Sequence, residues 1–170
     1  YTFTRNGDHI GWRQGEDKKW HLTLYVESGR IKDVPGHRLR SAMRAIADLD
    51  VCDFVMTANQ NLILANISAR NKAKVEKVLA DHGVAPKSLS GARRNSIACV
   101  ALPTCALALA ESERYLPHFL TKFESILDKA GLKDEEIVVR MTGCPNGCGR
   151  PYLGEIGFVG RSPGLYNLYL

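Results

Sequence analysis

The sequence predicts an α+β protein, because segments typical of strands alternate with segments typical of helices along the chain. Residues 20–26, WHLTLYV, alternate apolar and polar side chains and are rich in β-branched and aromatic residues, as strands are. Residues 36–48 follow Pro35 and carry apolar side chains at helical spacing. The 170 residues, 45% hydrophobic and 24% charged, are typical of a globular protein with one or two small domains.

The first half of the chain contains a second strand region and a second helix. Residues 53–57 and 61–66 are expected to be two strands joined by a polar corner. A helix is expected to begin after Ser68, its N-cap, and to end at Gly83. The order strand, helix, paired strands, helix is typical of half a ferredoxin-like fold. The apolar positions expected on the two helices are Leu39, Met43, Ile46, Ala47, Val75, Val78 and Leu79.

A Gly-, Pro- and Ser-rich segment, residues 83–95, is interpreted as a linker, so we expect domains at residues 1–86 and 87–170. After it, residues 96–100 are expected to form a short strand. Residues 105–116 are apolar at their start and are expected to form a buried helix. Pro117 is expected to open another helix that ends at Gly131, with one face formed by Phe119, Phe123, Ile126 and Leu127.

Three more strands are expected in the last third of the chain, at residues 135–142, 154–160 and 165–170. The second domain is therefore expected to be of the α/β class. The last strand runs to the end of the sequence without a turn, which predicts that this domain is truncated at its C-terminus.

Composition excludes some classes of protein. No segment approaches the roughly 20 apolar residues of a membrane span, and no basic and apolar leader opens the chain, so we expect a cytoplasmic protein without a membrane partner. The formal charge is +5 and the isoelectric point about 9.0, but basic and acidic residues are interleaved. Such a pattern is typical of a solvated surface and favours no nucleic-acid partner.

Four of the five cysteines form two closely spaced pairs. Cys99 and Cys105 are separated by five residues, and Cys144 and Cys148 by three, in the segment TGCPNGCG. Prolines stiffen both segments, and Gly143, Gly147 and Gly149 let the backbone approach a bound group closely. Cys105 is expected in the first turn of its helix, where the helix dipole favours a thiolate. Cys52 stands alone beside a strand and is interpreted as part of the core.

Spacing alone leaves several interpretations of these cysteines open. An iron–sulfur cluster takes four cysteine ligands. Structural zinc also takes four, although its paired ligands are usually two to four residues apart. Disulfides are possible, but a chain of this length does not need them to fold. Four unrelated buried cysteines are the plainest alternative, which the flanking glycines and proline argue against.

The two cysteine segments, NSIACVALPTCALALAESERYLP and RMTGCPNGCGRPYLGEIGFVGRSPGLYNLYL, resemble the sirohaem-dependent sulfite and nitrite reductases. The resemblance extends upstream through IGWRQGEDKKWHLTLYVESGRI and TANQNLILA, so it covers nearly the whole chain. It implies that Cys99, Cys105, Cys144 and Cys148 bind a 4Fe–4S cluster, and that Cys148 also binds the sirohaem iron axially. It further implies that Gln60, Asn61, Thr142 and Asn146 contact the sirohaem. A simple hairpin turn is the alternative for the corner at Gln60 and Asn61.

The residues after the first cysteine, VALPT, are similar to those of the sulfite branch rather than the nitrite branch. The resemblance implies the six-electron reduction of sulfite to sulfide, with electrons from an NADPH-dependent flavoprotein carrying FAD and FMN. It also implies that the Arg and Lys residues that bind sulfite lie upstream of this chain, so we expect the isolated chain to be inactive. Arg94 and Arg150 are candidates for pairing with sirohaem carboxylates. The alternatives are a nitrite reductase of the same family and a non-catalytic module that binds zinc or RNA.

Overall fold

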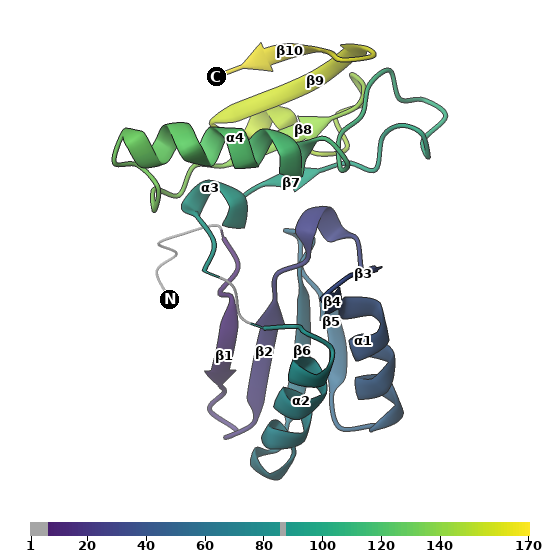
Figure 1. Cartoon of the computed structure of the whole chain (residues 1–170), viewed down its shortest axis with the longest axis vertical. Coiled ribbons are helices and arrows are strands. Elements are labelled where there is room, and N and C mark those ends of the chain that lie inside the picture. Colours follow the sequence, from purple (N-terminus) through teal and green to yellow (C-terminus); the bar gives the residue numbers. More distant parts are fainter. Residues whose placement is uncertain (1–6, 86–87) are drawn as a thin grey trace. The chain divides into compact units, whose positions relative to one another are not determined.

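The computed structural model describes residues 7–85 and 88–170 (Figure 1). These residues divide into two compact units, Asp8–Ser88 and Leu89–Leu170, and Gly7 belongs to the latter. The boundary expected between residues 86 and 87 lies outside the described residues. Within the described ranges, no helix combines the length and the apolar character that crossing a membrane requires.

The first unit is built on a four-stranded antiparallel sheet with the strand order β1-β2-β6-β5. Two helices pack on one face of it, and a short hairpin and one 3₁₀ turn complete the unit (Figure 1). This is the predicted mixed α+β unit. Its elements are β1 (Gly11–Gln14), β2 (Trp20–Leu24), η1 (Glu27–Gly29), β3 (Asp33–Val34), β4 (His37–Arg38), α1 (Leu39–Asp48), β5 (Asp53–Met56), β6 (Leu62–Ile67) and α2 (Ala69–Asp81).

The core of this unit follows the two periodicities of the sequence. Leu22, Leu62 and Leu64 project from one face of the sheet and are buried against the helices. The expected positions on α1 and α2 are confirmed except at Ala47, which is exposed, whereas Ala42 is fully buried. The helix expected from residue 36 begins at Leu39, because His37 and Arg38 pair with β3.

The ends of α2 show how far a residue type predicts its contacts. Gly83 ends the helix at a φ of 70°, and the Val84 N–H donates to the Leu79 carbonyl oxygen, as in a glycine-terminated helix. Ser68 occupies the N-cap position, but its side chain makes no capping hydrogen bond. The prediction was therefore right about the position of Ser68 and wrong about the capping interaction.

The second unit is built on a mixed sheet with the order β10-β9-β8-β7. Strands β7, β8 and β9 are parallel, and β10 is antiparallel to β9. The helix between β7 and β8 packs on one face of this sheet (Figure 1). The elements are α3 (Gly91–Arg94), β7 (Ile97–Ala98), α4 (Leu116–Lys129), β8 (Val139–Thr142), η2 (Pro151–Leu153), β9 (Ile156–Ser162) and β10 (Leu165–Tyr169).

The prediction of a buried helix over residues 105–116 is wrong. Residues 99–115 are turns and irregular chain, and the first helix after β7 is α4, which begins at Leu116. Leu107 is 68% exposed, so apolar character did not indicate burial here. The backbone N–H groups of Leu109 and Ala110 donate to the Gly143 carbonyl oxygen instead of to a helical partner.

Two smaller expectations also need correction. The segment interpreted as a linker contains the short helix α3, whose N-cap Ser90 accepts a hydrogen bond from the Arg93 N–H at 3.0 Å. On α4, Ile126 is 63% exposed, whereas Leu120, which lies one turn from Leu116, is buried. The buried stripe of α4 is therefore rotated relative to the expected one.

Candidate functional site

The four paired cysteines lie in two loops of the second unit. Cys99 directly follows β7, and Cys105 lies in the irregular segment that leads to α4. Cys144 and Cys148 lie in the loop between β8 and η2. All four are free thiols; Cys144 is buried, Cys148 is exposed, and the other two are partly buried. Since no helix begins near Cys105, the expected effect of a helix dipole on this thiol is withdrawn.

Backbone hydrogen bonds join the two cysteine loops around Gly143. Its carbonyl oxygen accepts from the N–H groups of Leu109 at 2.8 Å and Ala110 at 3.0 Å. Its N–H donates to the Cys99 Sγ at 3.2 Å. The Cys99 N–H in turn donates to the Met141 carbonyl oxygen at 3.1 Å. Both loops are therefore held by main-chain groups, and a sulfur atom is one of the acceptors.

Glycines are required where the loops meet. A Cβ atom at Gly143 would lie 2.5 Å from the Ala101 Cβ and 2.6 Å from the Ala110 carbonyl oxygen. At Gly149, a Cβ atom would lie 2.5 Å from the Met141 carbonyl oxygen. Both distances are shorter than real Cβ contacts, so any larger residue would separate the loops.

The donor set and its surroundings fit an iron–sulfur cluster in their chemistry. Four thiols on two hydrogen-bonded loops supply the ligands, and a backbone N–H directed at a cysteine sulfur is a common feature of such centres. As placed in residues 7–85 and 88–170, the side chains do not group three His, Cys, Asp or Glu closely enough to hold a metal ion. The two loops are therefore paired by hydrogen bonds, but their thiols are not gathered around one point.

Thr142 and Asn146 occupy different environments in the second cysteine loop. Thr142 is fully buried, and its hydroxyl donates to the Cys144 carbonyl oxygen at 2.9 Å. Asn146 is exposed at the tip of the loop. Thr142 therefore fixes the backbone of a predicted ligand, whereas Asn146 presents its amide to solvent.

The polar corner of the first unit, Thr57–Asn61, is organised by a residue far away in the sequence. The Asp8 carboxylate accepts hydrogen bonds from the Thr57 hydroxyl at 2.5 Å, the Asn59 amide at 3.1 Å and the Asn61 amide at 2.8 Å. The Asn61 side chain is buried and also accepts from the Val26 N–H at 3.0 Å. The corner is thus the turn of the β5–β6 hairpin, reinforced by a side-chain network on Asp8.

Gln60 lies at the tip of this corner with a φ of 66°. A Cβ atom at Gly29 would lie 3.1 Å from the Gln60 Cβ, so the glycine of η1 gives this side chain room. Of the two corner residues predicted to contact the sirohaem, Asn61 is occupied by internal hydrogen bonds and Gln60 is partly exposed. The structure thus assigns different environments to them.

The other sequence candidates also have defined positions. Arg94 lies 3.9 Å from the Glu136 carboxylate, and Arg150 is exposed in the left-handed conformation with a φ of 54°. Cys52 packs against the core of the first unit. Burial raises the pKa of its thiol and the negative charge of Asp53 raises it further, as suits an unreactive core cysteine.

Sequence reasoning missed Asp8, Ser112 and Arg140. Nothing in the local sequence connects Asp8 to a corner about fifty residues away. Ser112 is fully buried and its hydroxyl donates to the Met141 carbonyl oxygen at 2.7 Å, within a segment wrongly expected to be helical. Arg140 could have been found, because it interrupts the apolar run VVRMT at a position where strand alternation places it opposite the core.

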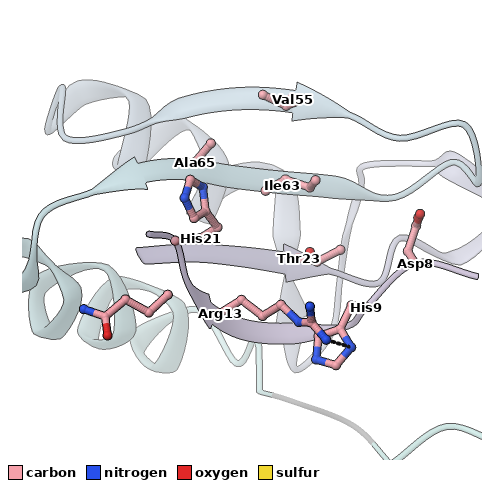
Figure 2. A pocket seen from close by; sticks show the side chains of 10 residues that line it. Asp8, His9, Arg13, His21, Thr23, Val55, Ile63 and Ala65 are labelled. Atoms are coloured by element: carbon pink, nitrogen blue, oxygen red, sulfur yellow. Dashed lines mark hydrogen bonds between the residues drawn. The ribbon is translucent and has the colours of Figure 1, made fainter. Parts of the chain in front are cut away.

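A hollow of about 510 Å³ lies on the face of the first sheet that the helices leave open. Figure 2 shows Thr23, Ile63 and Val55 on the neighbouring strands of its floor, with Arg13 directed at His9, whose Nδ1 lies 3.1 Å from the Arg13 Nη2. Its lining contains no cysteine and none of the other residues predicted to bind a cofactor.

Comparisons with known proteins agree with this architecture. Residues 13–82 match the family described as nitrite/sulfite reductase ferredoxin-like half domain. The chain is 54% identical over 171 residues to the sulfite reductase (NADPH) hemoprotein beta-component of Staphylococcus saprophyticus, covering 100% of the chain and 30% of that protein. It is 57% identical over 164 residues to the protein of the same name from Shewanella piezotolerans, covering 96% of the chain and 29% of that protein.

A solved structure, "Structure of Mycobacterium tuberculosis NirA protein", is also similar. It superposes with a TM-score of 0.72 at 26% identity and covers 94% of this chain and 29% of that one. The chain therefore spans about 30% of the length of its curated relatives.

Proposed function

Since residues 13–82 belong to the nitrite/sulfite reductase ferredoxin-like half-domain family and the whole chain is similar to sulfite reductase hemoproteins, we propose that it is the cluster-bearing part of such an enzyme. The intact protein would reduce sulfite to sulfide with six electrons, as part of sulfur assimilation. The observation that carries the proposal is the pairing of the two cysteine loops around Gly143, with a backbone N–H directed at the Cys99 sulfur.

In this proposal the four cysteine thiolates hold a 4Fe–4S cluster, and Cys148 also ligates the iron of a sirohaem. When bound, these groups supply the electron-transfer chemistry, which the protein itself cannot provide. The exposed position of Cys148 supports its role, because a thiolate shared by two centres must be accessible from outside its own loop. The ligand set is Cys99, Cys105, Cys144 and Cys148.

The remaining residues of the site contact the cofactor or position the residues that do. The Gly143 N–H stabilises negative charge on the Cys99 sulfur, and hydrogen bonds of this kind tune cluster potentials. The Thr142 hydroxyl fixes the peptide of Cys144. In the first unit, Asp8 and Asn61 hold the corner at whose tip Gln60 lies. We thus assign contact to Gln60, Asn146 and Cys148, and positioning to Asn61 and Thr142.

The electron donor we propose is a flavoprotein that oxidises NADPH. The support is the name of the relatives, which are NADPH-type hemoprotein components. We further propose that residues 1–170 alone do not turn over sulfite. A sulfite anion needs several cations for binding and protonation, and the resemblance to the family places those Arg and Lys residues upstream of this chain.

Cysteine substitution in the longer protein tests this proposal. Cys148→Ser is expected to abolish sulfite-dependent oxidation of a reduced dye and to change the visible spectrum of the coupled centre. Cys52→Ser is the matched control, because Cys52 packs in the core of the first unit and is expected to leave both readouts unchanged. Full activity of the Cys148→Ser protein would overturn the assignment.

Two alternatives remain distinguishable. The matching family covers nitrite as well as sulfite reductases, so faster turnover of nitrite than of sulfite by the same preparation would favour the nitrite branch. A non-catalytic module would contain stoichiometric zinc in the four-cysteine site and no iron.

A further inference from the structure

Arg140, in the middle of β8, has a charged side chain with buried and unpaired nitrogen atoms. Its Nε and Nη1 atoms are inaccessible to solvent and have no hydrogen-bond partner among the described residues. Residues 1–6 and 86–87 contain no Asp or Glu, so they have no carboxylate to offer. A buried guanidinium without an acceptor is unfavourable, and native proteins rarely keep one.

Strand alternation places Arg140 on the same face of the sheet as Cys99. Val139 and Met141, its neighbours in β8, pack in the core beneath α4. Arg140 therefore projects from the opposite face, as does Ile97, its partner in the register of β7. Cys99 lies two residues beyond Ile97 and so continues the same side of the sheet.

The aliphatic stem of the Arg140 side chain occupies a space that neighbouring glycines leave open. The segment that contains η2 packs over this face, since a Cβ atom at Gly157, the register partner of Arg140 in β9, would lie 2.3 Å from the Pro151 carbonyl oxygen. A Cβ atom at Gly154 would lie 2.8 Å from the Arg140 Cγ. The absence of a side chain at Gly154 thus leaves the space that the arginine stem occupies.

The surrounding charges favour an anion at this position. Burial lowers the pKa of the Arg140 guanidinium and the positive charge of Arg150 lowers it further, whereas Glu155 raises it. The Glu155 carboxylate already accepts from the Val138 N–H at 2.7 Å and forms no hydrogen bond to the buried Nε and Nη1 atoms of Arg140. The positive charge of Arg150 repels that of Arg140, and an anion bound at Arg140 would offset this repulsion.

We propose that Arg140 is an anion-binding residue whose guanidinium pairs with a carboxylate supplied from outside residues 1–170, on the face of the sheet that carries Cys99. Guanidinium groups bind carboxylates through directed, charge-assisted hydrogen bonds. Because Nε and Nη1 are covered within this chain, the carboxylate pairs with the guanidinium at Nη2, which is not among the covered atoms. The carboxylate comes either from an Asp or Glu of the longer protein or from the proposed tetrapyrrole. The inference rests on the proposed function for the tetrapyrrole and for the longer protein, since the relatives are about three times the length of this chain.

The sign of a stability change tests the pairing. Arg140→Met keeps the volume of the stem and removes the charge. In the 170-residue chain, the thermal midpoint is expected to rise or to stay within about 1 °C, because an unpaired buried cation is removed. In the longer protein, the midpoint is expected to fall by roughly 5 °C or more, because the substitution leaves a carboxylate buried without its partner.

The control is Arg161→Met, at an exposed arginine on β9 of the same sheet, and it is expected to change neither midpoint by more than about 1 °C. A fall in the cofactor-free and the loaded longer protein assigns the carboxylate to the polypeptide, and a fall only in the loaded form assigns it to the cofactor. A fall in the 170-residue chain, or no fall in the longer protein, overturns the proposal. Iron content, measured on the same samples, judges the proposed function separately.

Discussion

The two loop regions that we propose for cofactor binding differ in how far side chains stabilise them. In the corner Thr57–Asn61, backbone hydrogen bonds are supplemented by three side chains that donate to one carboxylate, that of Asp8. The cysteine loops are held by main-chain groups and by the close approach of glycines at Gly143 and Gly149. Side chains that maintain a loop are not available to a ligand. The cysteine loops leave their thiols free for ligation because their backbone holds the loops together.

The largest effect is expected from Gly143→Ala, because the new Cβ atom would overlap the Ala101 Cβ and the Ala110 carbonyl oxygen. We expect the free energy of unfolding of the second unit to fall by about 2–4 kcal/mol. Chemical denaturation followed by circular dichroism measures it, since neither tryptophan lies in this unit and fluorescence would not report on it.

Gly164→Ala is the control for Gly143→Ala. Gly164 has a φ of 73°, and a Cβ atom at this position would have no neighbouring atom within 4 Å. Only backbone strain is therefore expected there, about 1 kcal/mol. Equal losses at the two glycines would show that the loops are not held by close backbone approach.

Asp8→Ala disrupts the other loop region, the corner Thr57–Asn61. Removing the carboxylate leaves the Thr57 hydroxyl and the amides of Asn59 and Asn61 without this acceptor. We expect the free energy of unfolding of the first unit to fall by about 2–3 kcal/mol, measured by urea denaturation with tryptophan fluorescence. Asp48→Ala, at an exposed position on α1, is expected to change it by less than about 0.5 kcal/mol. A loss of the same size in Asp48→Ala would show that the hydrogen bonds to Asp8 have no special role in stability.

A smaller effect concerns a charged network in the second unit, away from the cysteine loops. The hydrogen bond from Arg93 lowers the pKa of the Glu124 carboxyl below its usual value, and Ser90 and the nearby positive charges contribute, while burial opposes. A carboxyl with a lowered folded-state pKa stabilises the protein above its unfolded pKa of 4.5 and loses this contribution as the pH falls through the folded value.

Glu124→Gln is therefore expected to reduce the free energy of unfolding by about 1 kcal/mol at pH 7 and to have no effect at a pH below the folded value. Urea denaturation between pH 7 and pH 3 measures the difference. A difference between the two proteins that stays constant over this range would contradict the role of the Glu124 charge.

The first unit was largely predictable from the sequence, because its helices and strands are regular and show their periods plainly. Leu39, Met43 and Ile46 recur at helical spacing, and β5 and β6 are apolar segments on either side of a polar corner. The second unit was predictable only in its strands and in α4. Residues 105–116 have the composition of a buried helix, but the N–H groups of Leu109 and Ala110 bind Gly143, a contact that no local pattern reveals.

The same distinction applies to the site. Cysteine spacing and glycine placement identified both loops, because those residues act through their own chemistry. Asp8 and Arg140 act through partners distant in sequence or outside it, so their roles appear only when the strands are paired and the corner is folded. The hydroxyl of Thr142 likewise turned out to serve the backbone of the loop.

The central claim is that two backbone-held loops present four thiols to an iron–sulfur cluster. The most direct measurement is iron, acid-labile sulfide and zinc analysis of the anaerobically purified longer protein, with its absorption spectrum. We expect iron and sulfide in near-equal amounts, apart from one additional iron when a porphyrin-type band is present, and loss of both when Cys99 or Cys144 is changed to Ser. Stoichiometric zinc without sulfide, or cluster content that survives both substitutions, would contradict the account.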